Sequence, residues 1–343
     1  MVQSTIDQII HGDALKVLDE LSSESIDLVL TDPPYFLDGF DDQWDTKRMA
    51  KSYKYYAVDS MVPGMKFDRE QGVRLYNWFL EIAPKLYRVL KPGGFAFVFA
   101  SPRLYHRLAC AMDDAGFNIR DCFMWLYTQN QPKAMSLKHF VRKLDIPEED
   151  KLVILEKLNG WKTPQIKSCF EPIVVAQKPY EGTLLKNFLT HNVGLFNTTV
   201  QVGQNMFPSN VLLVEKMDKH LDRYFLIPKP TREEKGLTNA HFTVKPVLLC
   251  QHLIQLATIP NAVVLDPFAG TGTTCVAAKA LQRHYLGIEI QEDYVDIALE
   301  RLQTNLGNES KRNRNAQLAL LEERSKYITD GMRTSERKKV THG

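Results

Sequence analysis

The chain has 343 residues, of which 44% are hydrophobic and 24% are charged, a balance typical of a globular protein that can bury a full core. This length suits one catalytic core with one or two insertions, and the composition excludes collagen-like, mucin-like and wholly disordered chains. The net charge of +2 does not by itself indicate a nucleic-acid binder. No apolar run approaches the roughly 18 residues of a membrane helix, and the first residues lack the pattern of a signal peptide. We therefore expect a cytoplasmic protein with no membrane partner.

Cysteine usage agrees with a reducing compartment. The five cysteines are widely spaced, odd in number and never arranged as CxxC: Cys110, Cys122, Cys169, Cys250 and Cys275. This pattern predicts free thiols, without a disulfide framework and without a zinc site.

Short apolar runs alternate with helix-like segments along much of the chain, which predicts an α/β fold with a doubly wound, mostly parallel sheet. Strands are expected at residues 26–30, 95–100, 262–265 and 285–290. Helices are expected at residues 73–90, 102–115, 275–283 and 291–302.

A glycine-containing loop follows one of these strands in the sequence VVLDPFAGTGTT. Gly270 and Gly272 allow a tight turn and a close approach of the backbone to a ligand. A dinucleotide fingerprint would need a third glycine where Cys275 stands, and a phosphate-binding loop would need Gly-Lys-Ser/Thr. The loop therefore favours a nucleoside-like ligand without pyrophosphate, with Asp266 available for an ammonium group. Glu289, at the end of the next expected strand, suits the two hydroxyls of a ribose, although it could be a surface residue at a helix start.

The tetrapeptide Asp32-Pro33-Pro34-Tyr35 follows the first expected strand. Two prolines stiffen the turn and leave its carbonyl groups free to accept hydrogen bonds. Asp32 and the Pro33 carbonyl could accept the two protons of an exocyclic amine while Tyr35 stacks on the ring. A plain proline-rich turn is the alternative interpretation of these four residues.

The two motifs together resemble those of S-adenosylmethionine-dependent DNA amino-methyltransferases, and their order resembles the β group of that family. The likeness extends to His11–Asp13, Lys91–Gly94, 170–179, Thr243–Pro246 and 287–302. It implies a Rossmann-like methyltransferase sheet with an inserted target-recognition region. It also implies an enzyme of a restriction–modification system, or an orphan or phage methylase.

The resemblance implies roles for individual residues. The catalytic set is Asp32, Pro33, Pro34 and Tyr35. The walls and methionine end of the cofactor site would be Asp266, Phe268, Ala269, Gly270, Thr271, Gly272 and Thr273. Glu289 would bind the ribose and Asp13 the adenine amine, while Thr243 and Lys245 would complete the site, with Lys245 placed to meet a carboxylate. S-adenosylmethionine is the only cofactor expected, and no metal is needed because the methyl donor already holds the driving force.

Asp as the first residue of the tetrapeptide points to adenine N6 as the target, with cytosine N4 as the alternative. Accepting the amine protons would favour the pyramidal nitrogen that attacks the methyl group, and no covalent intermediate is required. Reaching a base in double-stranded DNA requires its extrusion from the stack. A catalytically silent DNA-specificity subunit, and a methyltransferase acting on RNA or on a protein amide, are the competing hypotheses.

The resemblance divides the chain into four regions. Residues 1–179 would form the catalytic half of the core, including a loop at 36–70 and a helical insertion at 131–167, and residues 241–303 the cofactor-binding half. Residues 304–343 form a basic tail, with nine Lys/Arg against five Asp/Glu. Residues 180–240 would be the target-recognition region, in which Lys186, Asn187, His191, Asn192, Asn197, Gln201, Gln204, Asn205 and Asn210 could read base edges. Cations of the helical insertion could contact phosphates, and a homodimer is compatible with the resemblance.

Overall fold

The computed structural model describes residues 6–35, 69–126, 134–164, 169–200, 208–212 and 244–303. Within these ranges no helix is both long enough and apolar enough to cross a membrane. The strands are β1 (Gln8–His11), β2 (Ile26–Thr31), β3 (Leu90–Phe99), β4 (Asn118–Leu126), β5 (Phe170–Gln177), β6 (Val211–Leu212), β7 (Val263–Asp266) and β8 (His284–Glu289). The helices are α1 (Ala14–Glu20), α3 (Arg69–Val89), α4 (Tyr105–Asp114), α5 (Lys138–Arg142), α6 (Glu148–Lys157), α7 (Leu184–His191), α9 (Val247–Ala257), α10 (Thr273–Ala280) and α11 (Glu292–Gln303).

The described strands form one sheet in the order β1-β8-β7-β2-β3-β5-β4-β6. The pairs from β1 to β3 are all parallel, whereas β5 runs antiparallel to both of its neighbours, β3 and β4. The predicted mostly parallel, doubly wound sheet is therefore confirmed. The chain leaves β2 toward β3 and leaves β7 toward β8, so the adjacent pair β2–β7 is the topological switch point. Ligands of such sheets bind at the carboxyl ends of the strands at this point.

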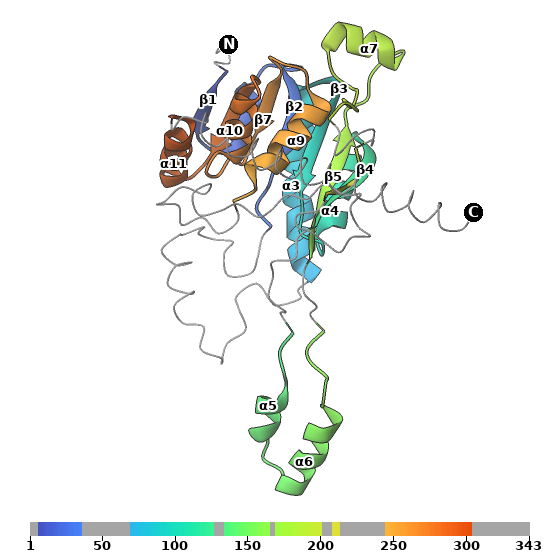
Figure 1. Cartoon of the computed structure of the whole chain (residues 1–343), viewed down its shortest axis with the longest axis vertical. Helices are drawn as coiled ribbons and strands as arrows, with labels where there is room; N and C mark the ends of the chain where they lie inside the picture. Colours follow the sequence, from blue (N-terminus) through green and yellow to red (C-terminus); the bar gives the residue numbers. More distant parts are fainter. Residues whose placement is uncertain are drawn as a thin grey trace, which may run out of the picture.

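Helices cover both faces of the sheet, as Figure 1 shows. One apolar core joins α9, α10 and α11 to the strands, with Leu253, Val276 and Ala298 among its buried residues. The other core joins α1, α3 and α4 to the opposite face, with Phe79 and Leu108 fully buried. Because each large apolar side chain contributes about 1.5–3 kcal/mol on full burial, these two cores stabilise the sheet from both sides.

Helix α3 forms where apolar spacing predicts it. Leu75, Phe79, Ile82 and Leu86 recur on one helical face and are all fully buried. The helix starts at Arg69, slightly before the predicted residue 73. The boundaries of the other predicted helices and parallel strands agree to within a few residues.

Strand β3 differs from its prediction because it starts at Leu90 rather than at residue 95. The Lys91–Gly94 segment, Lys-Pro-Gly-Gly, lies inside the strand as an irregularity, where the pairing with β2 shifts register between Ile26 and Leu28. Gly93 adopts φ +80°, a conformation that side chains disfavour, so this glycine permits the irregularity. Lys91 Nζ contacts Asp27 Oδ1 at 2.7 Å and anchors the segment to β2.

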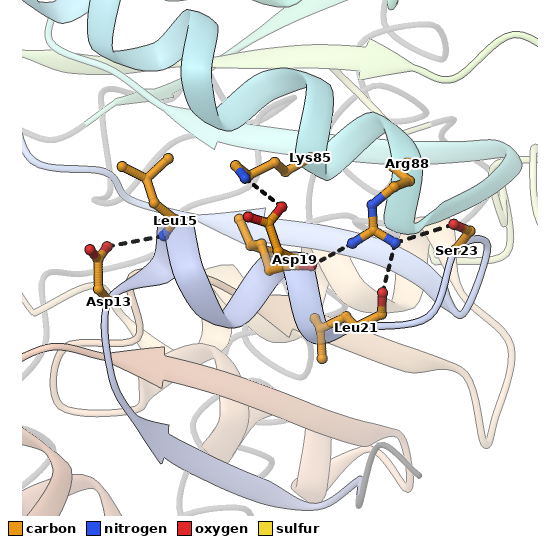
Figure 2. A network of polar contacts seen from close by, with 8 residues as sticks. Asp13, Leu15, Asp19, Leu21, Ser23, Lys85 and Arg88 are labelled. Carbon is orange, nitrogen blue, oxygen red and sulfur yellow. Dashed lines mark hydrogen bonds and ion pairs between the residues drawn. The ribbon is translucent and has the colours of Figure 1, made fainter. Parts of the chain in front are cut away.

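Helix α1 is attached to α3 by polar contacts that Figure 2 shows. Arg88 donates to the Leu21 carbonyl at 2.7 Å and to Ser23 Oγ at 3.2 Å, and Lys85 forms an ion pair with Asp19. Asp13 caps the start of α1 by accepting a hydrogen bond from Leu15 N at 3.0 Å. The cap holds Asp13 at the carboxyl end of β1, beside the sheet edge where the predicted site lies.

Helix α7, the first element of the predicted target-recognition region, lies at the amino end of β3. Asn187 is buried beside Gly93, and its Nδ2 donates to the Val193 carbonyl at 3.2 Å. Asn192 ends the helix in the left-handed conformation, with φ 59°. The Asp32 tetrapeptide follows the opposite, carboxyl end of β2, which is parallel to β3. The prediction that Asn187 reads bases is therefore wrong, because its side chain stabilises the amino edge of the sheet.

Helices α5 and α6 lie in a separate arm that projects away from the sheet in Figure 1. The arm, residues 134–164, is inserted between the end of β4 and the start of β5. Leu126 pairs with Phe170 at the carboxyl edge of the sheet, so the chain leaves the sheet before the arm and re-enters it after the arm at the edge of the predicted site. The described part of the helical insertion predicted for residues 131–167 holds α5 and α6.

Candidate active site

The two sequence motifs meet at the switch point of the sheet. Leu28 and Val29 of β2 pair with Val264 and Leu265 of β7, so both strands end at the same edge. Thr31 Oγ1 donates a hydrogen bond of 2.7 Å to Asp266 Oδ1, joining the last residue of β2 to the last residue of β7. The structure thus brings together the tetrapeptide and the glycine loop, which lie more than 230 residues apart in sequence.

Asp32 is held by two partners from different segments. The Tyr35 hydroxyl donates to Asp32 Oδ1 at 2.5 Å, and Lys245 Nζ forms a hydrogen-bonded ion pair with Oδ2. A carboxylate offers about four lone-pair positions, so each oxygen keeps acceptor capacity for a ligand. Pro33 is buried, whereas Asp32 and Tyr35 are half-buried at the surface of this edge. The tetrapeptide is therefore a stiff turn with a carboxylate of fixed direction.

The glycine loop has the backbone that its sequence predicts. Gly270 and Gly272 have φ values of 51° and 77°, where a β-carbon is disfavoured. A β-carbon on Gly272 would also stand 2.8 Å from Cβ of Ala298 in α11. Both glycines are thus required, one of them also because a helix packs closely behind the loop.

Arg301 of α11 fixes this loop from behind, a role that the sequence motifs do not predict. Its Nη1 donates to the carbonyl and the hydroxyl of Thr271, at 2.6 and 3.0 Å, and to the Thr273 hydroxyl at 3.1 Å. Thr271, Thr273 and Arg301 are all buried. An arginine in the last turn of an amphipathic helix has no distinctive sequence signal, so only the packing of α11 reveals this contact.

Asp266 is turned into the protein. Its Oδ1 accepts from Thr31 Oγ1 at 2.7 Å and from Phe268 N at 3.1 Å, and the side chain is buried. Burial raises the pKa of Asp266 to about 6, although hydrogen bonds from Thr31 and Thr274 act in the opposite direction. The carboxylate predicted to meet an ammonium group thus also ties the loop to β2. Its function toward the cofactor stays a prediction.

Phe268 and Ala269 form the apolar part of the loop. The Phe268 ring packs against Trp78 of α3, with 5.3 Å between ring centroids, and Ala269 is buried. Ala269 N donates to the Ile288 carbonyl at 2.9 Å, which fastens the loop to β8. The loop is therefore packed against α3 through Phe268 and fastened to β8 through Ala269.

Glu289 lies at the end of β8, directly beside the loop. Its Oε2 accepts from Gly270 N at 2.8 Å and its Oε1 from Gln291 N at 2.9 Å. Burial raises the pKa of Glu289, and the backbone hydrogen bonds from Gln291 and Gly270 partly offset this effect. Each oxygen of the ionised carboxylate keeps a free lone pair. The carboxylate can therefore still accept hydrogen bonds from two hydroxyl groups.

Asp13 lies close to Glu289 because β1 pairs with β8. His11 is the register partner of Glu289, and Gly12 N donates to the Glu289 carbonyl at 2.9 Å. Asp13 Oδ1 is used by the cap of α1, which leaves Oδ2 able to accept an amine proton. The structure thus gathers the predicted ribose and adenine residues at neighbouring strand ends.

Lys245, predicted to meet a carboxylate in the cofactor site, contacts two carboxylates of the protein itself. Its Nζ pairs with Asp32 and lies 3.1 Å from Glu171 Oε2, on β5. Glu171 was missed in the sequence because it belongs to an otherwise apolar strand whose antiparallel direction was not predicted. Thr243, the other residue predicted for this element, lies outside the described residues.

The two buried thiols, Cys250 and Cys275, lie in the apolar core. All five cysteines are free, which confirms the prediction. Burial raises the pKa of Cys250 to about 12 and that of Cys275 well above its usual value, so both remain protonated thiols.

An α/β sheet with a ligand loop and an acidic, aromatic tetrapeptide at its switch point defines the class of nucleoside-cofactor-dependent transferases. Comparison with known proteins places the chain within this class. Residues 26–300 match the model of a family described as DNA methylase, and the chain belongs to this family. The resemblance to DNA amino-methyltransferases is therefore confirmed.

Relatives support the same family. The Type II methyltransferase M.HindIII of Haemophilus influenzae is 31% identical over 319 residues, covering 87% of this chain and 95% of the relative. The Type II methyltransferase M.HinfI of Haemophilus influenzae is 28% identical over 305 residues, covering 88% of this chain and 69% of the relative. The chain is thus similar to methyltransferases of restriction–modification systems over most of its length.

Among solved structures, the PvuII DNA methyltransferase, named as cytosine-N4-specific, matches with a TM-score of 0.53 and 20% identity, and the match covers 89% of each chain. This likeness concerns the fold. The chain is a DNA methyltransferase, and S-adenosylmethionine is its methyl donor. The residues fit this cofactor, since the acceptors Glu289 and Asp13 stand at adjacent strand ends beside a left-handed glycine loop.

Proposed function

We propose that this chain transfers a methyl group to N6 of adenine in double-stranded DNA. The observation that supports this most directly is the placement of Asp32 at the same sheet edge as the glycine loop, linked to it through the Thr31–Asp266 hydrogen bond of 2.7 Å. Asp rather than Ser at the head of the tetrapeptide favours adenine. Cytosine N4 is the second candidate, since one protein of similar fold is named as cytosine-N4-specific.

The tetrapeptide would act on the exocyclic amine of an extruded base. An aromatic amine is a poor nucleophile because its lone pair is delocalised into the ring. Hydrogen bonds from the amine to the Asp32 carboxylate and the Pro33 carbonyl would favour the pyramidal nitrogen of the transition state. The Tyr35 ring lies three residues further along the same stiff turn, where it can stack on the base while its hydroxyl holds Asp32.

The cofactor half of the site would act by positioning. S-adenosylmethionine supplies a methyl group on a sulfonium, which is ready for in-line displacement. Glu289 and Asp13 would bind the ribose and the adenine amine, and the loop held by Arg301 would contact the methionine part. Because the loop and the tetrapeptide leave neighbouring strands, the acceptor nitrogen and the methyl group are brought to one place, which lowers the entropic cost of reaction.

The projecting arm would contact the DNA backbone. Lys138, Arg142 and Lys143 are exposed on and directly after α5, on an insertion that starts and ends at the carboxyl edge. Cations that neutralise phosphates make affinity fall steeply with salt. The variant Lys138→Glu/Arg142→Glu should weaken binding to all duplexes and lower the salt dependence. The variant Lys157→Glu, at an exposed position of α6, is the control on the same arm, and equal effects of both variants would contradict this contact.

The side chains that recognise base edges would lie in the part of the predicted recognition region that follows α7. Asn187 is buried and α7 lies at the amino edge, so residues 184–192 are removed from the proposal. Gln201, Gln204 and Asn205 lie outside the described residues. They remain candidates because their amides can form two hydrogen bonds to adenine in the major groove.

The decisive experiment is the identification of the methylated base. The chain would be incubated with tritium-labelled S-adenosylmethionine and plasmid DNA, and the DNA digested to nucleosides for chromatography and mass spectrometry. Label in N6-methyl-2′-deoxyadenosine supports the proposal, whereas label in N4-methyl-2′-deoxycytidine establishes the second candidate. Sequencing of modified bases in the same plasmid identifies the recognition sequence. Transfer to RNA or protein in the absence of transfer to DNA would overturn both.

A further inference from the structure

A buried ammonium group lies between two carboxylates at the active edge. Lys245 is only 8% exposed, and its Nζ contacts Asp32 Oδ2 and lies 3.1 Å from Glu171 Oε2. The same nitrogen lies 5.0 Å from the centroid of the Phe99 ring, which closes one side of the group. The three charged residues come from the turn after β2, from the start of β5 and from the segment before α9. We refer to them as the Asp32–Lys245–Glu171 cluster.

The charges of this cluster are balanced against burial. Burial alone lowers the pKa of Lys245, but the nearby Asp32 and Glu171 carboxylates more than reverse the effect, so the pKa lies above its usual value. Lys245 is therefore a permanent cation. An unpaired buried ammonium would cost several kcal/mol, so the cation requires its carboxylates. Glu171 Oε2 is buried and has no hydrogen-bond partner within the described part of the chain, so the ion pair with Lys245 is its main compensation.

The cluster determines where Asp32 points. Lys245 holds Oδ2 from one side and the Tyr35 hydroxyl holds Oδ1 at 2.5 Å from the other. A carboxylate bound at both oxygens cannot rotate about its Cβ–Cγ bond without losing one contact. Its remaining lone pairs are thereby directed, and a shift of about 1 Å in such a group can reduce a rate about 100-fold.

We propose that Lys245 is a positioning residue for Asp32, and that Glu171 in turn positions Lys245. This role rests on the proposed function of Asp32 as acceptor of the amine protons. It differs from the role that the resemblance implies for Lys245, because the ammonium pairs with Asp32, on the methyl-acceptor side of the site, and with Glu171 of β5. Glu171 acts on Asp32 only indirectly, since its carboxylate contacts Lys245.

The test separates the rate of methyl transfer from the affinity for the cofactor. Single-turnover transfer to duplex DNA and the dissociation constant of S-adenosylmethionine, by calorimetry, would be measured for Lys245→Met and Lys245→Arg. The role predicts a rate about 100-fold lower in Lys245→Met, with a dissociation constant within about twofold of the parent, and partial recovery of the rate in Lys245→Arg. A dissociation constant at least tenfold higher with an unchanged single-turnover rate would overturn it.

A double-mutant cycle tests whether Lys245 acts through Asp32. Adding Lys245→Met to Asp32→Asn should lower the residual rate less than about threefold, because the group to be positioned is already altered. Full additivity of the two losses would contradict the proposal. If Lys245→Met does not fold, Glu171→Gln applies, since glutamine keeps the size of the side chain. It should lower the rate about tenfold without changing the cofactor affinity, and an unchanged rate counts against the proposal.

Lys178 offers a matched control at the other edge of the sheet. It is 7% exposed, contacts Glu24 at 3.3 Å and lies 4.9 Å from the Tyr87 ring centroid, a setting similar to that of Lys245. Lys178→Met should lower thermal stability but leave the single-turnover rate unchanged. A rate loss equal to that of Lys245→Met would show a merely structural effect and would overturn the role. Absence of transfer by the parent chain itself would instead refute the proposed function.

Discussion

The buried charged groups at the two edges of the sheet have different kinds of partners. At the amino edge, each buried charge is satisfied by one opposite charge and one backbone group. Asp27 contacts Lys91 at 2.7 Å and accepts from Val263 N at 2.7 Å, and Lys178 contacts Glu24 and donates to the Leu90 carbonyl at 2.8 Å. At the carboxyl edge, one ammonium faces two carboxylates, and Asp266 is buried with a raised pKa.

This difference separates stability from function. Paired charges at the amino edge fasten the strand starts to one another. The carboxyl edge keeps carboxylates with spare acceptor capacity, a state that costs stability and is maintained where a ligand binds. Variants at the two edges should therefore fail in different assays.

The largest effect is expected at Asp32. Asp32→Ala removes the proposed acceptor of the amine protons, so the single-turnover rate should fall at least about 1000-fold. Cofactor affinity should change little, because the proposed partner of Asp32 is the target base. Rapid-quench transfer assays and calorimetry would measure the two quantities. A loss of cofactor affinity with normal residual transfer would be inconsistent with this role.

The next effect concerns the pH dependence of stability. Burial raises the pKa of Asp266 from its ordinary value of 3.8 to about 6, so the folded state binds its proton more tightly than the unfolded chain. Stability from this group is full below pH 3.8 and is lost as the pH rises through 6. The loss is about 3 kcal/mol, since one pH unit of displacement corresponds to about 1.4 kcal/mol. Asp266→Asn, which keeps an acceptor for Thr31, should lack this loss.

Urea unfolding of the parent and Asp266→Asn between pH 4 and pH 7 would test this expectation. The free energy of unfolding of the parent should decline relative to the variant as the pH rises. Parallel curves over this range would contradict the assignment of the titration to Asp266.

A smaller effect is expected for the cofactor. Glu289→Ala removes both the proposed ribose acceptor and the hydrogen bond from Gly270 N, so the dissociation constant for S-adenosylmethionine should rise about 30-fold. The rate at saturating cofactor should fall much less than in Asp32→Ala. Calorimetric titration measures this, and an unchanged constant would remove Glu289 from the ribose site.

The smallest effect is expected at the amino edge. Asp27→Asn weakens the contact with Lys91 and should lower the free energy of unfolding by about 1–2 kcal/mol. The rate of methyl transfer should stay the same in folded protein, because Asp27 lies at the end of β2 remote from Asp32. A loss of transfer rate without a loss of stability would contradict the assignment of function to the carboxyl edge.

Much of the parallel core could be predicted because it is encoded locally. The apolar runs of β2, β7 and β8 and the helical spacing of α3 are set by the burial of neighbouring residues in the sequence. Gly270 and Gly272 likewise have the positive φ values that their positions predict. The antiparallel strands β4 and β5 were not predicted, since the direction of a strand depends on the strand with which it pairs.

The sequence by itself determined the class of fold, the two motifs and the residue types needed to handle an amine and a nucleoside cofactor, because these depend on local burial and on intrinsic side-chain chemistry. Only the tertiary structure decided the partners of those residues. It turned Asp266 toward Thr31, brought Arg301 behind the loop, placed Lys245 between Asp32 and Glu171, and put α7 at the amino edge. Such contacts join residues as far as 235 positions apart, and only the packing of the helices on the sheet determines which of them meet.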